Sequence, residues 1–106
     1  MIARLWSART TQAQSQIYLR HFSASVLPAL RRFEGYISST VLTRLANSGV
    51  EILVITVWQS IAAIDAFAGA DREAAVVAPE AAALLTDYDR RVRHFEIASM
   101  DGAIFG

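Results

Sequence analysis

Cysteine is absent from this chain of 106 residues, and so is lysine. The lack of cysteine excludes disulfides, thiolate nucleophiles and cysteine-ligated metals, and it is typical of a domain that is stable in the reducing cytoplasm. The missing lysine accompanies abundant alanine and arginine, so it indicates a bias in composition and not a function. We therefore predict a cytoplasmic protein, of a length that fits one domain.

The formal net charge is zero, because ten basic residues balance ten acidic ones. The arginines are scattered from Arg4 to Arg93, whereas a nucleic-acid-binding protein gathers its cations on one surface. No apolar run approaches the roughly 20 residues that span a bilayer, and residues 1–10 lack the apolar core of a signal peptide. Neither nucleic acid nor a membrane is an expected partner.

Metal-binding motifs are missing as well. The chain has only two histidines, His21 and His94, and no HxxE or HExxH spacing. His21 lies at the edge of an amphipathic helix, which predicts a partly exposed surface residue. Because no glycine-rich phosphate loop is present either, the sequence predicts no metal and no bound cofactor.

Residues 50–59 (VEILVITVWQ) form the most informative stretch that the chain does contain. The run is rich in β-branched residues and is apolar at both odd and even positions, so it predicts a strand that must be covered on both faces. The expected helices suffice for one face only. The other face is therefore predicted to meet a second copy of the chain, which makes the protein a homodimer.

The remaining segments complete an alternating plan. Strands are expected at residues 2–9, 36–45 and 89–98, with a hairpin turn at 47–49. A helix capped by Thr10 or Thr11 is predicted to run to about residue 33 with a kink at Pro28, and Ser60 is predicted to cap a second helix. Short helical pieces are expected at 72–77 and 80–85.

This order of elements, βαββαβ, predicts an α+β protein of the ferredoxin-like class with a four-stranded antiparallel sheet. The domain is expected to cover residues 1–98, followed by a tail at 99–106 that is either free or docked through Ile104 and Phe105. The helix at 12–33 is expected to bury the stripe Tyr18, Phe22, Val26, Ala29 and Phe33.

The faces of the sheet give the candidate site. If odd positions pack under the helices, even positions form a second surface that is apolar with a few polar groups. Such a surface is typical of a small-molecule cavity. Its members are Arg4, Trp6, Thr40, Ile52, Val54, Thr56, Trp58 and His94.

The segments YLRHFSASVLPALRRFEGY, VWQS and IDAF resemble the antibiotic biosynthesis monooxygenase family, a group of small dimeric α/β-barrel proteins. The resemblance spans most of residues 2–97. It implies that two sheets face each other across a dimer interface and that each protomer encloses a cavity. It also implies one of several activities, since the family includes oxygenases of polyketide phenols and quinols, heme-degrading enzymes and members of unknown role.

The same resemblance argues against heme degradation. Heme-degrading members use an asparagine on the first strand, a tryptophan in the helix after the third strand and a histidine further along. Here Phe67 and Val77 occupy the tryptophan and histidine positions, and the single asparagine, Asn47, lies in the hairpin turn.

His94 is the candidate catalytic residue. It could act as a base that takes a phenolic proton, so that the electron-rich phenolate reacts with dioxygen. It could instead be a structural histidine that is hydrogen-bonded to Glu96, Arg4 or another neighbour.

The candidate substrate-binding residues are aromatic, cationic and hydroxylic. Trp58 and Trp6 could stack on a flat ligand or could fill the core of the dimer. Arg4, if buried, needs an anionic partner, which could be Glu96 or a substrate carboxylate. Thr56 and Thr40 would add polar contacts.

Two functions therefore remain open from the sequence. The first is a cofactor-independent monooxygenase that acts on a small aromatic or quinol-like molecule. The alternative is a non-catalytic dimer that binds a small hydrophobic ligand.

Overall fold

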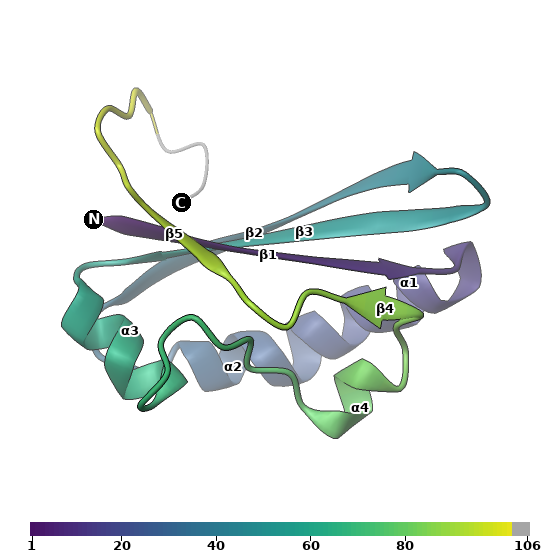
Figure 1. The fold of residues 1–106 in the computed structure, drawn as a ribbon, viewed down its shortest axis with the longest axis horizontal. Helices are drawn as coiled ribbons and strands as arrows, with labels where there is room; N and C mark the ends of the chain where they lie inside the picture. The colour runs from purple at the N-terminus through teal and green to yellow at the C-terminus, as the bar shows by residue number, and fades with distance from the viewer. Residues whose placement is uncertain (103–106) are drawn as a thin grey trace.

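The computed structural model describes residues 1–102, so the predicted docking of Ile104 and Phe105 lies outside the described residues. An antiparallel sheet forms one layer and the helices form a second layer on one of its faces (Figure 1). The segment after the last strand rises on the opposite side of the sheet (Figure 1). This arrangement confirms the predicted α+β, ferredoxin-like plan.

Three long strands make up most of the sheet, and all lie within one or two residues of their predicted bounds. They are β1 (Ile2–Thr10), β2 (Tyr36–Ala46) and β3 (Gly49–Trp58). The hairpin between β2 and β3 has a two-residue loop, in which Asn47 adopts a left-handed φ of 55°. Asparagine tolerates that conformation better than most residues, so the loop chemistry agrees with the sequence.

The last strand differs from its prediction, because it is divided into β4 (Asp87–Tyr88) and β5 (Arg93–Glu96). Both pieces pair with β1, which makes the sheet five-stranded with the order β2-β3-β1-β4. Between β4 and β5 the chain separates from β1, because its backbone there forms hydrogen bonds with Glu73 and Ala75 instead. The amide of Ala75 donates to the carbonyl of Arg90 at 2.9 Å, and Val92 donates to Glu73 at 2.8 Å.

The same contacts explain why residues 72–77 are not helical, contrary to prediction. Their backbone groups bond to distant segments, so they cannot form a helical turn. The charged side chains at 71–73 and 87–91 are exposed, and several of them pair with each other, as Arg91 and Asp71 do at 2.6 Å. The predicted helix at 80–85 is shorter than expected, forming α4 (Pro79–Ala82).

The first helix is divided near Pro28, as predicted, but through a π-helical turn. The pieces are α1 (Gln12–His21), the π-helical turn Phe22–Val26 and α2 (Leu27–Leu30). Thr11 caps α1 by accepting a hydrogen bond from the amide of Gln14 at 3.1 Å. The wider π-helical turn shifts the buried positions by one residue towards the C-terminus. Leu30 is therefore buried, whereas Ala29, which was predicted to be buried, is exposed.

The parity prediction is wrong for β1, β3 and β5, whose even positions lie beneath the helices. Ile52 and Trp58 have no exposed surface, and Ile64 of α3 (Ile61–Ala68) packs in the same core. Ser60 caps α3 as predicted, by accepting from the amide of Ala63.

In β2 the odd positions face the helices instead. The two-residue loop pairs Ala46 with Gly49, so Thr40 lies opposite Ile55 and Val41 lies opposite Val54, and a bulge shifts the register only between Tyr36 and Ser38. Thr40 is therefore on the open face of the sheet, away from the other candidate residues.

In the described part of the chain, no helix is long and apolar enough to cross a membrane.

Candidate functional site

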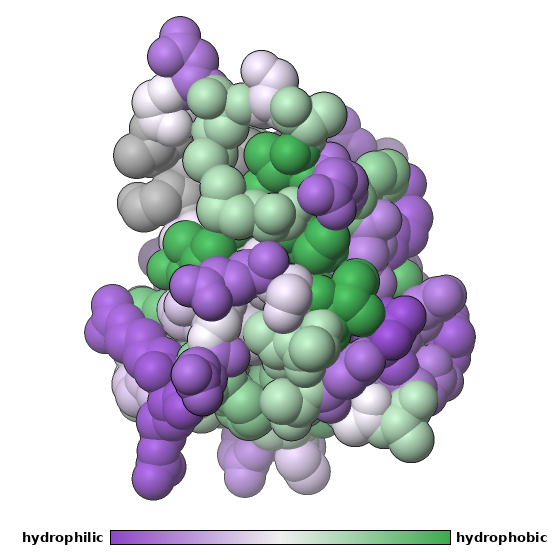
Figure 2. All heavy atoms as spheres, turned by 90° about the vertical axis from the view of Figure 1, so that its left-hand side faces the viewer, coloured by the Kyte–Doolittle hydropathy of each residue, from purple (hydrophilic) through white to green (hydrophobic). Residues whose placement is uncertain are grey.

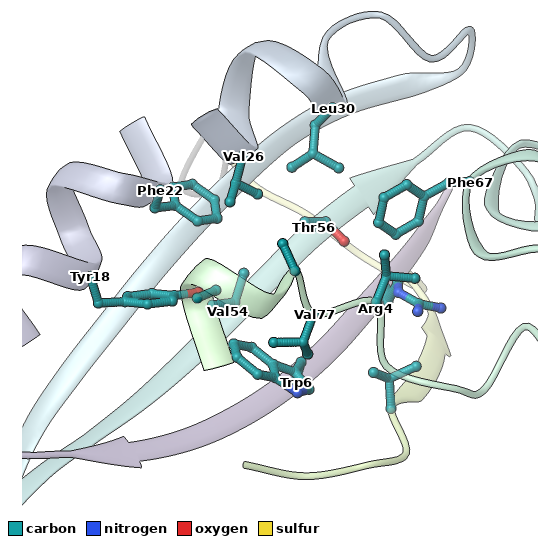
Figure 3. Close-up of a pocket in the computed structure, with 14 residues that line it drawn as sticks. Arg4, Trp6, Tyr18, Phe22, Val26, Leu30, Val54, Thr56, Phe67 and Val77 are labelled. Atoms are coloured by element: carbon teal, nitrogen blue, oxygen red, sulfur yellow. The ribbon is translucent and has the colours of Figure 1, made fainter. Parts of the chain in front are cut away.

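A cavity of about 90 Å³ lies between the helix-covered face of the sheet and the helices themselves (Figure 3). It thus lies on the helix-covered face within one chain, whereas the sequence analysis placed it on the other face of the sheet, which was predicted to meet a second copy. Most of its lining is apolar. The lining residues are Arg4, Trp6, Tyr18, Phe22, Val26, Leu30, Val54, Thr56, Phe67, Val76, Val77, Ala78, Ala81 and Val92.

Arg4 lies at one end of the cavity, on β1 beneath Phe67 (Figure 3). Its side chain is buried, and the guanidinium carbon lies 5.5 Å from the centroid of the Phe67 ring, within the range of a cation–π contact. Its Nη1 donates to the carbonyl of Arg72 at 2.6 Å, and its Nη2 donates to the carbonyl of Ala74 at 2.9 Å. These two carbonyls fix the guanidinium in place.

His94 is adjacent to Arg4 across the β1–β5 pair, but it does not line the cavity. Its Nε2 lies 2.9 Å from Nη1 of Arg4. Arginine has no acceptor, so Nε2 must accept and the histidine proton must be on Nδ1. Burial, and then the positive charge of Arg4, lower the pKa of His94, which keeps the ring neutral.

Two aromatic residues form the opposite side of the cavity. Trp6 contacts the Tyr18 ring at a centroid distance of 6.4 Å, and its Nε1 donates to the carbonyl of Asp89 at 2.9 Å. Burial raises the pKa of Tyr18 to about 12, so its hydroxyl keeps its proton. No hydrogen bond joins that hydroxyl to another side chain or backbone group among residues 1–102, so it can bind a ligand.

The structure brings some of the sequence candidates together and separates others. Arg4, Trp6 and Thr56 line the same cavity. Trp58 lies below it, fully buried among aromatic rings, and its Nε1 donates to the hydroxyl of Thr56 at 2.9 Å. Thr40 is on the other face of the sheet, so it does not reach this cavity.

Sequence reasoning missed the residues that the helices contribute. Tyr18, Phe22 and Val26 were assigned to the core, yet they line the cavity at a spacing of four residues through the π-helical turn. Turns of this kind occur often at functional sites. Pro28 was the only available signal, since it predicted an irregular helix without specifying its form.

The described residues contain no group of three or more histidine, aspartate, glutamate or cysteine side chains that could hold a metal ion. The predicted partner of Arg4, Glu96, lies elsewhere. Its carboxylate is 3.9 Å from the amino-terminal ammonium of Met1 and is 73% exposed.

Known structures share this fold at low sequence identity. A protein from Bacillus cereus assigned to the antibiotic biosynthesis monooxygenases has a TM-score of 0.65 and 19% identity, covering 96% of this chain and 97% of that chain. A protein from Deinococcus radiodurans with the same assignment has a TM-score of 0.60 and 17% identity, over 100% of both chains.

The heme degrader MhuD from Mycobacterium tuberculosis, whose structure holds two hemes in its active site, has a TM-score of 0.61 and 19% identity, covering 96% of this chain and 100% of that chain. The chain matches no protein-family model and no curated protein sequence. The predicted resemblance is therefore confirmed at the level of the fold.

Proposed function

We propose that this chain, which has the fold of the antibiotic biosynthesis monooxygenases, is a cofactor-independent monooxygenase of a small aromatic or quinol-like molecule. The observation that carries the proposal is the cavity of about 90 Å³, whose apolar lining is interrupted by the polar side chains of Arg4, Tyr18 and Thr56. A site of this composition holds an aromatic ring by apolar contact and orients it by a few polar contacts.

In this reaction the substrate supplies all the electrons. A phenol with a free para position reacts with dioxygen to give a para-quinone and water. One oxygen atom forms the new carbonyl and the other leaves as water with two substrate hydrogens, so dioxygen accepts four electrons and the substrate loses four. The phenolate is the reactive form, because its charge raises the energy of the ring electrons.

The chain can favour the phenolate without a residue that accepts its proton directly. Arg4 supplies positive charge, and the hydroxyl of Tyr18 can donate a hydrogen bond to a phenolate oxygen. Both effects stabilise negative charge on the ligand. His94 then acts through Arg4, because its Nε2 already accepts from that side chain.

Oxygen consumption with ¹⁸O₂ tests this proposal. Purified protein and an electron-rich phenol should consume one dioxygen per quinone formed, with one ¹⁸O atom in the quinone and one in water. Uncatalysed oxidation to hydrogen peroxide gives a different product and serves as the control. If phenols bind but are oxidised no faster than without protein, the alternative holds and the chain is a ligand-binding protein.

Heme degradation is not expected, although MhuD shares the fold. Among the lining residues only Tyr18 belongs to a type that ligates heme iron, and it would have to bind as a phenolate, which its pKa of about 12 opposes. The cavity of about 90 Å³ is also small beside the roughly 300–1,000 Å³ of typical ligand sites. Hemin incubated with the protein and a reductant should keep its Soret absorbance, and formation of a linear tetrapyrrole would contradict this prediction.

We also propose that the chain is a homodimer through the open face of its sheet. Leu42 is 44% exposed there, and Phe95 is 49% exposed. A hollow of about 380 Å³ beside Leu42, Leu53 and Arg93 would receive side chains of a second copy. Figure 2 shows hydrophobic side chains gathered across the middle of the end where β5 and the amino terminus lie. Exposed apolar side chains that gather on one surface often mark an interface between proteins.

Light scattering at micromolar concentration should give about twice the 11.6 kDa mass of one chain. Leu42→Asp should produce a monomer, because it would place an unpaired charge in the interface. Leu45→Asp is the matched control, since Leu45 is 71% exposed on the same strand but faces the other side of the sheet. A folded wild-type monomer at this concentration would contradict the proposal.

A further inference from the structure

Arg4 is a buried cation that contacts only uncharged groups in the described part of the chain. Its side chain is 5% exposed, and no carboxylate among residues 1–102 lies within 4 Å of the guanidinium. Burial lowers its pKa, as expected where no anion offsets the loss of water. A buried charge of this kind calls for a counter-ion.

The guanidinium of Arg4 has hydrogen-bond donors that no described residue uses. Arginine carries five N–H groups, and three are used by the carbonyl of Arg72, the carbonyl of Ala74 and Nε2 of His94. Within the described residues, Nε–H and the second N–H of Nη2 have no acceptor. These are adjacent nitrogens of one planar fork, which is the geometry that binds a carboxylate through both of its oxygens.

The hydroxyl of Tyr18 is the second polar group with unused hydrogen-bonding capacity. Figure 3 shows it at the side of the cavity away from Arg4, with Val54 and Trp6 between them. It is buried and stays protonated, so it acts as a hydrogen-bond donor. A ligand that spans the two groups therefore needs an anion at one end and an acceptor at the other.

The cavity also limits the size of that ligand. Its volume of about 90 Å³ is small beside the roughly 300–1,000 Å³ of typical ligand sites. A single aromatic ring needs only modest movement of the lining side chains, such as the half-exposed Val76. Two fused rings would need more space than one and should bind less tightly.

We propose that the cavity takes a single-ring aromatic carboxylate with a ring hydroxyl, its carboxylate paired with Arg4 and its hydroxyl oxygen hydrogen-bonded by Tyr18. This inference rests on the proposed function, in which that ring hydroxyl belongs to the substrate. It narrows the substrate class from small aromatic molecules to hydroxybenzoates.

Titration calorimetry with 3-hydroxybenzoate and 3-hydroxybenzamide tests the anion. The two probes have nearly the same shape, and only the acid is charged. The wild-type protein should bind the acid about 10-fold or more tightly, since charge-assisted hydrogen bonds are the stronger kind. Equal affinities would overturn the inference, and this comparison needs no mutation.

Two variants then locate the contacts. Arg4→Gln should reduce binding of the acid to the level of the amide and leave binding of the amide unchanged, and Arg4→Met, which is also uncharged, replaces it if the glutamine variant does not fold. Tyr18→Phe should weaken the binding of 3-hydroxybenzoate but not the binding of benzoate. An acid preference that persists in the Arg4 variant, or tighter binding of 6-hydroxy-2-naphthoate than of 3-hydroxybenzoate, would overturn the assignment.

The outcome is separable from that of the proposed function. Selective binding of the acid without oxygen consumption would retain the ligand class and reject the oxygenase. Oxidation of neutral phenols with no preference for the acid would retain the oxygenase and reject the ligand class.

Discussion

Trp58→Ala is expected to cost about 3–5 kcal/mol of folding free energy, a large part of the roughly 5–15 kcal/mol that stabilises a typical domain. Trp58 has no exposed surface. Its ring contacts those of Phe33, Tyr36 and Phe67 at centroid distances of 6.4, 5.5 and 5.2 Å. Removing the indole leaves a void among three rings that come from different segments and cannot collapse together. Urea unfolding followed by circular dichroism measures the loss.

Two further variants separate the core role of Trp58 from other effects. Trp58→Phe keeps a ring but loses the hydrogen bond to Thr56, so it should cost only about 1–2 kcal/mol. Leu45→Ala, at a site that is 71% exposed, should change stability by less than about 0.5 kcal/mol. A loss below about 1 kcal/mol for Trp58→Ala would show that the indole is not part of the core, and it would restore Trp58 as a candidate ligand contact.

The placement of Trp58 shows what the sequence could predict about the fold. The β-branched run at residues 50–59, the threonine and serine caps and the asparagine turn each reflect local preferences of the chain, and all appear at the predicted positions. The face of each strand depends instead on which side the helices cover. Residues 50–59 are apolar on both sides, so their pattern cannot decide between them.

The face on which Thr40 lies could have been predicted from the sequence. A two-residue loop at Asn47 and Ser48 pairs Ala46 with Gly49, which places odd positions of β2 on the same face as even positions of β3. Applying the predicted turn to the register would have moved Thr40 off the face that carries Thr56. A common parity for all strands is therefore not compatible with this turn.

The chemistry of the site was harder to predict, because it depends on contacts between distant segments. The carbonyls of Arg72 and Ala74 bind Arg4 from about 70 positions along the chain, within a segment whose alanines favour a helix in isolation. The π-helical turn that brings Val26 to the cavity has no sequence signature. The sequence analysis named burial of Arg4 and its hydrogen bond to His94 as alternatives, but its two carbonyl partners could not be predicted.

His94→Ala is expected to lower kcat/KM for the oxidised phenol about 100-fold, through the loss of support for Arg4. The imidazole Nε2 accepts one N–H of that guanidinium at 2.9 Å, and without it only the two carbonyls of Arg72 and Ala74 hold the cation, which orients its ligand less precisely. A general-base role for His94 stays a prediction, and the geometry favours a positioning role because Nε2 is already engaged. Oxygen uptake and the pH profile of each variant distinguish the two roles.

The pH profile follows from the lowered pKa of His94. Burial is the main cause, and Arg4 contributes next. Glu73 raises the pKa, Arg72 lowers it and Asp65 raises it, with the net shift downward from 6.5. The unfolded state therefore binds more protons between the lowered pKa and 6.5, so stability is complete above pH 6.5 and falls as the pH drops toward the folded pKa. Activity should fall below that pKa, because protonated Nε2 can no longer accept from Arg4 and adds a second cation beside it.

His94→Gln separates a positioning residue from a base. The glutamine carbonyl can accept the Arg4 N–H but does not titrate, so this variant should keep activity within a few-fold of wild type and lose the acid limb of the profile. A general base would behave differently, because glutamine cannot take a proton and both variants would fall by roughly 100-fold. Equal losses in His94→Gln and His94→Ala would therefore reject the positioning role and assign His94 as the base, with Arg4 moving to release Nε2 during turnover.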